Sequence, residues 1–164
     1  MKNILAILAA LLLGSAAFAH EFKLGDLKIG HPHMPAPPKG AMSAAGYFTI
    51  TNTGTTDDSL TGITAGFAKQ AMVHGTKVDA AGVARMTDLP VLDIPAGATV
   101  TLEPGALHVM FMGISGPMPD GAMLPATLTF AKAGTVNVEF KVDKPGAKGA
   151  TDDMDMDMDM APAN

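Results

Sequence analysis

The chain of 164 residues contains no cysteine, carries a formal net charge of −5 and has 13 methionines. The absence of cysteine excludes disulfides, thiolate copper sites, cysteine-based zinc sites and thiol redox catalysis. The negative charge argues against nucleic acid or an anionic membrane surface as a partner.

The first residues have the pattern of a secretory signal peptide. Lys2 precedes an apolar run at residues 4–14, and residues 17–19, Ala-Phe-Ala, form an A-x-A cleavage site. The run is short for a membrane span, and no later stretch is long and apolar enough for one. We therefore expect a signal peptide at residues 1–19, export to the periplasm and no membrane insertion of the processed chain.

The rest of the chain, up to residue 143, shows the pattern of short strands. Alternating apolar and polar runs recur about every eight to twelve residues, with Gly- and Pro-containing turns between them. Residues 22–30 predict a first strand, and the Pro-rich segment 31–38 predicts a loop or edge segment. Further strands are expected at residues 45–54 (ending in a turn at 52–54), 59–65, 69–78, 83–87, 89–94, 98–102, 107–112, 127–131 and 136–142. Together they predict one all-β domain at residues 20–143, an antiparallel sandwich or barrel.

The composition changes at Lys144. Residues 144–153 have the Pro, Gly and Lys content of a linker, and residues 153–160 alternate strictly between Asp and Met. Like charges at every second position resist packing, so we expect residues 144–164 to be a linker and a disordered tail. Two interpretations of the tail stay open. It is either a soluble acidic extension or a metal-gathering arm, whose candidate ligands are Met154, Met156, Met158 and Met160.

Two His–Met pairs form the main candidate site: His74 with Met86, and His108 with Met110. His108 and Met110 lie two apart in the alternating run ALHVMFM, so both side chains belong to one face of one strand. An imidazole beside a thioether suits a soft or borderline metal ion, and Cu(I) is the best match. The alternative is that both are inward-facing core residues of a strand.

The register of a predicted hairpin decides whether Met86 joins His74. If residues 80–82 form a three-residue loop with Gly82 in the left-handed region, residue 79 pairs with 83 and residue 74 with 88. Met86 then lies diagonal to His74 on the same face, about 7–8 Å away. A four-residue loop would send Met86 to the opposite face.

These residues resemble the motif of PCuAC-type periplasmic copper chaperones, which has a His, a Met about ten residues later and, after a longer spacer, His-x-Met. Here twenty-one residues separate Met86 from His108, as in the family, whereas eleven separate His74 from Met86. Thr76 stands where the family often has a second Met. The segments HEFKLGDLKIGHP, AGYFTITNTG, DIPAGATVTLEPGALHVMFMG and the last two strands are also similar, although the family often has HPW where this chain has HPH.

The resemblance implies a cupredoxin-like Greek-key β-sandwich or barrel that has no redox role. It further implies that one Cu(I) binds to His74, Met86, His108 and Met110 and passes, with Sco-type copper proteins, towards the dinuclear centre of cytochrome c oxidase subunit II. We expect a monomer without enzyme activity. Two alternatives stay open: a periplasmic copper-buffering or resistance protein that stores copper, and an interaction module without metal.

Several further residues are candidate secondary ligands. His20 would follow the cleavage site, where its amine and imidazole could chelate Cu(II); the alternative is a frayed end. A histidine-brace oxygenase would need a second His beside it and a substrate groove, and the sequence has no groove signature. His31 and His33 flank a proline in an expected solvated loop, where they would form a secondary Cu(II) site. Met72 and Met112 each lie an even number of residues from a candidate ligand in the same expected strand, and therefore on the same face. They are expected to be packing neighbours.

Overall fold

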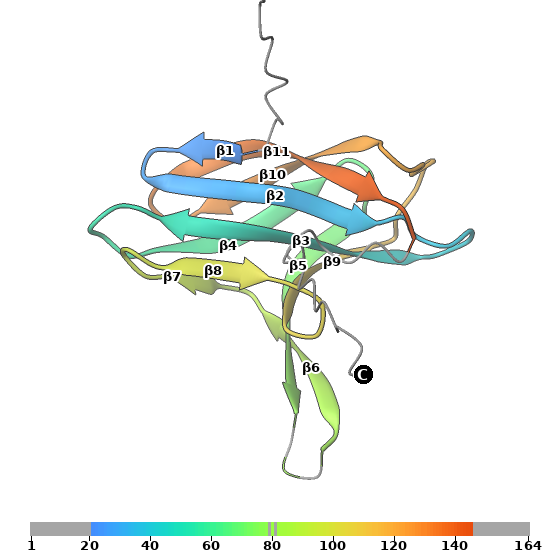
Figure 1. Cartoon of the computed structure of the whole chain (residues 1–164), viewed down its shortest axis with the longest axis horizontal. Coiled ribbons are helices and arrows are strands. Elements are labelled where there is room, and N and C mark those ends of the chain that lie inside the picture. The colour runs from blue at the N-terminus through green and yellow to red at the C-terminus, as the bar shows by residue number, and fades with distance from the viewer. Residues whose placement is uncertain (1–20, 79, 81, 146–164) are drawn as a thin grey trace, which may run out of the picture.

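The computed structural model describes residues 21–78, 80 and 82–145, and this part of the chain forms strands and no helix (Figure 1). Within it, therefore, no helix is long and apolar enough to cross a membrane. The strands, in chain order, are β1 (Glu21–Leu24), β2 (Leu27–Pro35), β3 (Ser43–Asn52), β4 (Asp58–Ala65), β5 (Gln70–Val78), β6 (Ala84–Leu89), β7 (Leu92–Ile94), β8 (Thr99–Leu102), β9 (Leu107–Met112), β10 (Met123–Phe130) and β11 (Gly134–Asp143).

Seven of the strands close into a barrel in the order β2, β11, β10, β4, β5, β9, β3 and back to β2. The other four attach to its wall: β1 pairs with β2, β6 with β5, β7 with β4 and β8 with β3. The all-β prediction is confirmed. One detail of the antiparallel prediction is wrong, because β11 and β2 run parallel where Lys141 pairs with His33.

The barrel interior holds one apolar core. Strands β2, β3 and β11 largely alternate buried and more exposed residues, as period-two side chains require. Phe48, Phe111 and Phe140 are at most 2% exposed, and Phe140 meets the other two rings edge-on, at 5.8 and 5.2 Å between centroids. Gly46 leaves room for them, because a Cβ there would lie 2.7 Å from the Phe111 ring and 2.8 Å from that of Phe140.

The N-terminal part of the domain differs from the prediction. Residues 22–30 are not one strand but parts of β1 and β2, which turn at Gly25 with φ of 57°. His31 and His33 lie within β2 rather than in a loop. A bulge between Gly30 and His33, with His31 at φ 50°, places Pro32 where the ladder to β3 is interrupted. Because proline has no N–H to donate, a bulge is where a barrel strand accommodates it.

Prolines also move two other strand limits. β10 begins at Met123 rather than at residue 127, and it contains Pro125. The ladder from β10 to β4 begins only at Ala126, so Pro125 pairs with β11 alone and its missing N–H costs no bond to β4. β7 begins at Leu92 rather than at residue 89, because Leu89 ends β6 and Pro90 separates the two strands.

The hairpin of β5 and β6 has the predicted register. His74 pairs with Asp88 and Thr76 with Met86, and Gly82 has φ of 79°. Only the base of the hairpin belongs to the barrel, where β5 pairs with β9 from Gln70 to Gly75. The rest extends beyond the wall as an arm, which Figure 1 shows below the barrel. We call this projecting part, the described residues among 76–87, the arm.

Asp58, at the start of β4, holds the turn between β10 and β11. Its carboxylate accepts hydrogen bonds from the backbone N–H groups of Ser59, Lys132 and Ala133, at 2.7, 2.9 and 2.9 Å. Partial burial raises the pKa of Asp58, but these hydrogen bonds and the charge of Lys132 outweigh it, so the net pKa is below its ordinary value. The carboxylate therefore stabilises the fold above the unfolded-state pKa, and that contribution disappears as the pH falls through the folded-state pKa.

We expect Asp58→Ala to lower the free energy of unfolding by about 1.5–3 kcal/mol at pH 7, the range for hydrogen bonds to a charged group. The difference from the parent should shrink as the pH falls below about 4, the ordinary pKa of Asp, and then through the lower pKa of the folded state. Urea denaturation at pH 7 and pH 3 measures both values. An equal loss at the two pH values would show that the charge of Asp58 does not contribute.

Candidate metal centre

Two histidines face each other across the ladder between β5 and β9. His74 pairs directly with His108, and their ring centroids lie 5.6 Å apart at an interplanar angle of 72°. Two positions along the same ladder, and therefore on the same face, Met72 pairs with Met110. The register thus groups two imidazoles and two thioethers on the outer face of the barrel wall.

The group is partly enclosed although it lies outside the core. His108 is 6% exposed and the His74 side chain 12%, while Met72 and Met110 are of intermediate burial. Val109, next to His108, is fully buried on the opposite face. The strands therefore divide their residues between an apolar core on one side and a donor-rich, sheltered face on the other.

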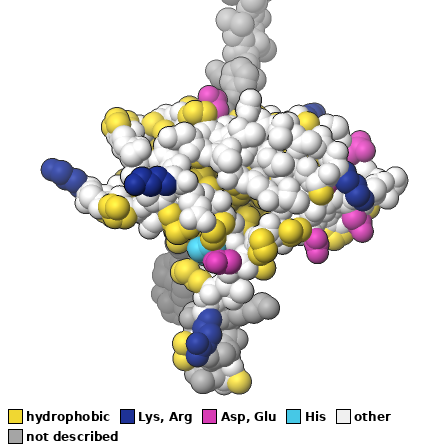
Figure 2. Space-filling model, turned by 180° about the vertical axis from the view of Figure 1, so that it is seen from behind, with side chains coloured by type: hydrophobic (Ala, Val, Ile, Leu, Met, Phe, Trp, Pro, Cys, Tyr) yellow, Lys and Arg dark blue, Asp and Glu magenta, His cyan; other side chains and the backbone are white. Residues whose placement is uncertain are grey.

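His74 has polar atoms without hydrogen-bond partners. Both of its ring nitrogens are buried and neither makes a hydrogen bond. Nε2 lies 3.1 Å from Oδ1 of Asp88, close enough for an ion pair but not aligned for a hydrogen bond. Figure 2 shows histidine and acidic atoms side by side where the arm meets the barrel. Buried nitrogens without a partner are costly unless something else coordinates them, and a metal ion fits that role.

His108 is held in the form that binds metal. Burial lowers the pKa of His108; a hydrogen bond to the backbone of Ala106 acts in the opposite direction, and the charge of His74 lowers the pKa further. The net pKa is below its ordinary value. The imidazole is therefore neutral at neutral pH, as a ligand to a metal must be.

Met86 lies on the predicted face but, unlike the other three predicted ligands, its side chain is mostly exposed. It pairs with Thr76, diagonal to His74, and is 65% exposed. The structure thus brings His74, His108 and Met110 together on two adjacent strands and leaves Met86 on the arm. In the described residues there is no cluster of three or more His, Cys, Asp or Glu. The donors that the register of β5 and β9 groups are imidazole nitrogen and thioether sulfur, which suit a soft ion.

Three neighbours of the site were not predicted as part of it. Asp88 was foreseeable, because the hairpin register that was predicted already opposes it to His74. Met72 was expected to be a packing neighbour, and only the pairing of β5 with β9 reveals that it opposes Met110. Tyr47 follows Gly46, the partner of Val109, so it shares the outer face with His108. Burial raises the pKa of Tyr47, which keeps its phenol neutral.

The candidate secondary ligands have different outcomes. His31 is exposed, whereas His33 is half-buried, packs against Tyr47 with 5.6 Å between ring centroids, and donates from Nδ1 to the carbonyl of His31 at 2.9 Å. One nitrogen of His33 is thus already engaged. Met112 pairs with Ser43 and Gln70 at the end of β9. The remaining candidates lie outside the described residues: His20, Met154, Met156, Met158 and Met160.

Comparisons with known proteins show the family and the fold of this chain. A family model described as "Putative lipoprotein LpqE-like" matches residues 27–142. The copper-bound PCuAC domain from PmoF2 superposes with a TM-score of 0.67 and 31% identity, over 77% of this chain and 99% of that domain. The Cu(I) form of DR1885 from Deinococcus radiodurans gives a TM-score of 0.59 and 30% identity, over 77% of this chain and 83% of that one.

A curated relative in Leifsonia xyli, named "Putative lipoprotein Lxx21020", is 29% identical over 103 residues, which are 63% of this chain and 62% of that protein. The chain belongs to the LpqE-like family and is a PCuAC-type protein. The cupredoxin-like β fold that the resemblance implied is thereby confirmed.

Proposed function

We propose that this protein is an exported copper chaperone that binds one Cu(I) through His74, His108 and Met110, with Met86 closing the site from the arm. The observation that carries the proposal is the direct pairing of His74 with His108, because both nitrogens of His74 are buried without hydrogen bonds. The similar structures of a copper-bound domain and of a Cu(I) form add support.

The chemistry of these donors fits a carrier. Cu(I) has no strong geometric preference and binds thioethers and imidazoles well. Neutral thioethers hold it less tightly than thiolates would, so an acceptor with thiolate ligands can withdraw it. Met86 is 65% exposed and stands at the rim, where an incoming ligand could replace it first. The arm would then be the place where transfer begins.

The destination follows from the resemblance alone. We propose delivery in the periplasm, as a monomer, with Sco-type copper proteins and towards the dinuclear centre of cytochrome c oxidase subunit II. The signal-peptide pattern at residues 1–19 and the lipoprotein description of the family support export. A strain that lacks the protein should lose oxidase activity and regain it on added copper; unchanged activity would contradict this destination.

Storage is the second candidate function, and the alternating segment at residues 153–160 favours it. The two functions predict different capacities. A chaperone should keep its single Cu(I) after deletion of residues 151–164, whereas a storage protein should lose most of its capacity. Metal analysis of both forms, loaded with excess Cu(I) under anaerobic conditions, measures the difference.

X-ray absorption spectroscopy of the Cu(I) protein tests the ligand set directly. We expect a first shell of two nitrogens and two sulfurs, from two imidazoles and two thioethers. Met86→Ala should remove one sulfur, while Met42→Ala, which truncates a methionine that is 75% exposed in the loop before β3, should remove none. A spectrum without sulfur scatterers would refute the site.

A further inference from the structure

The outer face of β5 and β9 carries a third methionine beyond the pair already described. Met72 pairs with Met110, and Met112 follows two residues later in β9, at the position that pairs with Gln70. Because side chains alternate along a strand, Met110 and Met112 share the outer face, and Met112 lies diagonal to Met72. The register therefore places three thioethers at neighbouring positions of one face.

These three methionines are not core residues. Each is of intermediate burial. In the described part of the chain, none of them belongs to the buried apolar cluster or to the partly buried side chains that pack against it, whereas the half-buried Met118 does. Filling gaps in a core is the usual role of methionine, and it does not account for the positions of Met72, Met110 and Met112.

The neighbours of these methionines leave room for their side chains to converge. On the β3 side, Met110 pairs with Ala45 and Met112 with Ser43, and both partners have small side chains. On the other side, Met72 borders a cleft of about 180 Å³ at the seam between β4 and β5. Methionine has three rotatable bonds, so side chains at paired and diagonal positions can bring their sulfur atoms onto one ion.

An ion bound to all three sulfurs occupies a different position from an ion bound to the histidines. Met112 is four residues from His108 in the same strand, a distance of about 13 Å at the usual rise per residue. Strand side chains stand roughly perpendicular to the sheet, so these two do not reach one ion. Met110 lies halfway between them and can contribute to either position. The face therefore offers two adjacent positions for a soft ion, one with imidazole nitrogen and one with thioether sulfur alone.

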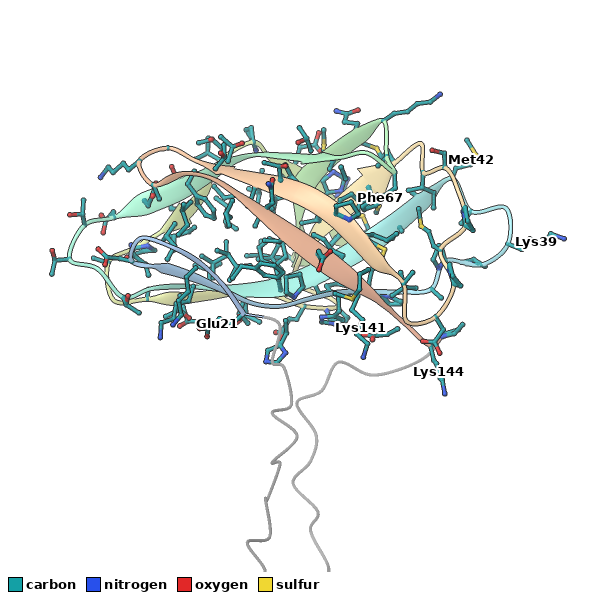
Figure 3. The ribbon with its side chains drawn as sticks, turned by 90° about the horizontal axis from the view of Figure 1, so that it is seen from above. Glu21, Lys39, Met42, Phe67, Lys141 and Lys144 are labelled. Atoms are coloured by element: carbon teal, nitrogen blue, oxygen red, sulfur yellow. The ribbon has the colours of Figure 1, made fainter. Side chains whose placement is uncertain are left out.

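The histidine pair lies between this methionine group and the arm. Along β5, Met72 comes before His74, and the arm comes after it. At the other end of the face, Met42 (labelled in Figure 3) is 75% exposed, and its carbonyl accepts hydrogen bonds from the N–H groups of Gly113 and Ile114, directly after β9. An ion that arrives at this end of the face therefore meets thioethers before it meets imidazoles.

We propose that Met72, Met110 and Met112 form a second Cu(I) position, where the ion binds before it moves to the histidine pair. We call these three residues the thioether station. The station deepens the proposed function and rests on it, because Met110 belongs to both positions and the ion that enters is the ion that is delivered. Entry and release then use opposite ends of one face, with the station at one end and Met86 on the arm at the other.

Methyl NMR of the full chain, isotope-labelled at the methionine methyl groups and kept anaerobic, tests the station. In the variant His74→Ala with His108→Ala, added Cu(I) should shift the methyl signals of all three station methionines along one saturation curve. The signal of Met123, another half-buried methionine on an outer strand face, should stay in place. Unmoved station signals would overturn the proposal, as would an equal shift of Met123, which would show binding to surface methionines in general.

A pair of single variants tests the station with both histidines in place. Met112→Ala should slow the loading of Cu(I) from a chelator several-fold, because the station loses one of its three ligands. Met123→Ala removes the same side chain from β10 and should load at the rate of the parent. Stopped-flow absorbance of the chelator complex measures both rates. Equal rates for the parent and Met112→Ala would contradict a role of the station in entry.

The NMR signals also separate this proposal from the proposed function. Suppose that Cu(I) shifts the imidazole signals of the parent, while the station signals of the variant without His74 and His108 do not move. The station is then refuted, and the histidine site stands. If the station signals of that variant shift and the imidazole signals of the parent do not, the histidine site is refuted and the thioethers alone bind the ion.

Discussion

Replacement of His108 and Met110 together by alanine should weaken Cu(I) binding by more than about 100-fold and leave the barrel folded. Loss of an outer-shell partner alone typically costs a metal site 10- to 100-fold, and this variant removes two direct ligands. The fold should survive, because both side chains lie on the outer face of β9, whereas the core residues of that strand are Val109 and Phe111. Competition with a chromophoric Cu(I) chelator measures the affinity, and circular dichroism checks the fold.

The matched control removes the same two residue types elsewhere. His31→Ala with Met42→Ala takes away one imidazole and one thioether, both exposed and on other strands or loops. Its Cu(I) affinity should equal that of the parent. If the control loses as much affinity as the double variant of β9, copper is held by surface methionines and histidines in general. If neither loses affinity, the site lies elsewhere.

Local rules were enough to predict the half of the site that lies in the hairpin. The register of β5 and β6 follows from the length of one loop and from the left-handed conformation that Gly82 adopts. The position of Asp88 opposite His74 follows from the same register. The face shared by His108 and Met110 follows from the period of two.

The joining of the two halves could not be derived from the residues. The pairing of His74 with His108 is a contact between β5 and β9, and nothing local to either strand specifies it. The resemblance to a family motif predicted that contact, and periodicity alone did not. The parallel ladder of β11 with β2 and the bulge at His31 are likewise products of barrel closure, which a strand-by-strand reading cannot reveal.

Proline was the main reason for errors in strand limits. The sequence rules demote a run that contains proline, yet Pro32 and Pro125 both lie inside barrel strands. Each lies where the strand has no continuous ladder on one of its two sides, so the missing N–H removes no ladder hydrogen bond there. For Pro32 this is the bulge in β2, and for Pro125 it is the part of β10 before the ladder to β4 begins. Such positions exist only once the neighbours of a strand are known.

Phe111→Ala should lower the free energy of unfolding by about 3–5 kcal/mol, the usual cost of emptying a fully buried phenylalanine site. Phe111 is 0% exposed, and its ring lies between those of Phe67 and Phe140, at 4.9 and 5.2 Å between centroids. The cavity cannot collapse easily, because rings from two different segments line it. Since domains of this size are stable by about 5–15 kcal/mol, the variant should lose a large share of its stability.

The control for this variant is Phe22→Ala, which removes the same atoms from a half-buried position on the edge strand β1 and should cost clearly less. Met110→Ala, next to Phe111 but on the outer face, should also cost little.

Thermal unfolding with and without Cu(I) then connects the core to the site. Because a ligand that binds only the folded state stabilises it, Cu(I) should raise the melting temperature of Phe111→Ala but not that of the variant without His108 and Met110. A Phe111→Ala protein that melts like the parent would mean that β9 does not depend on this core, and so would contradict the division of the strand into a structural and a metal-binding face.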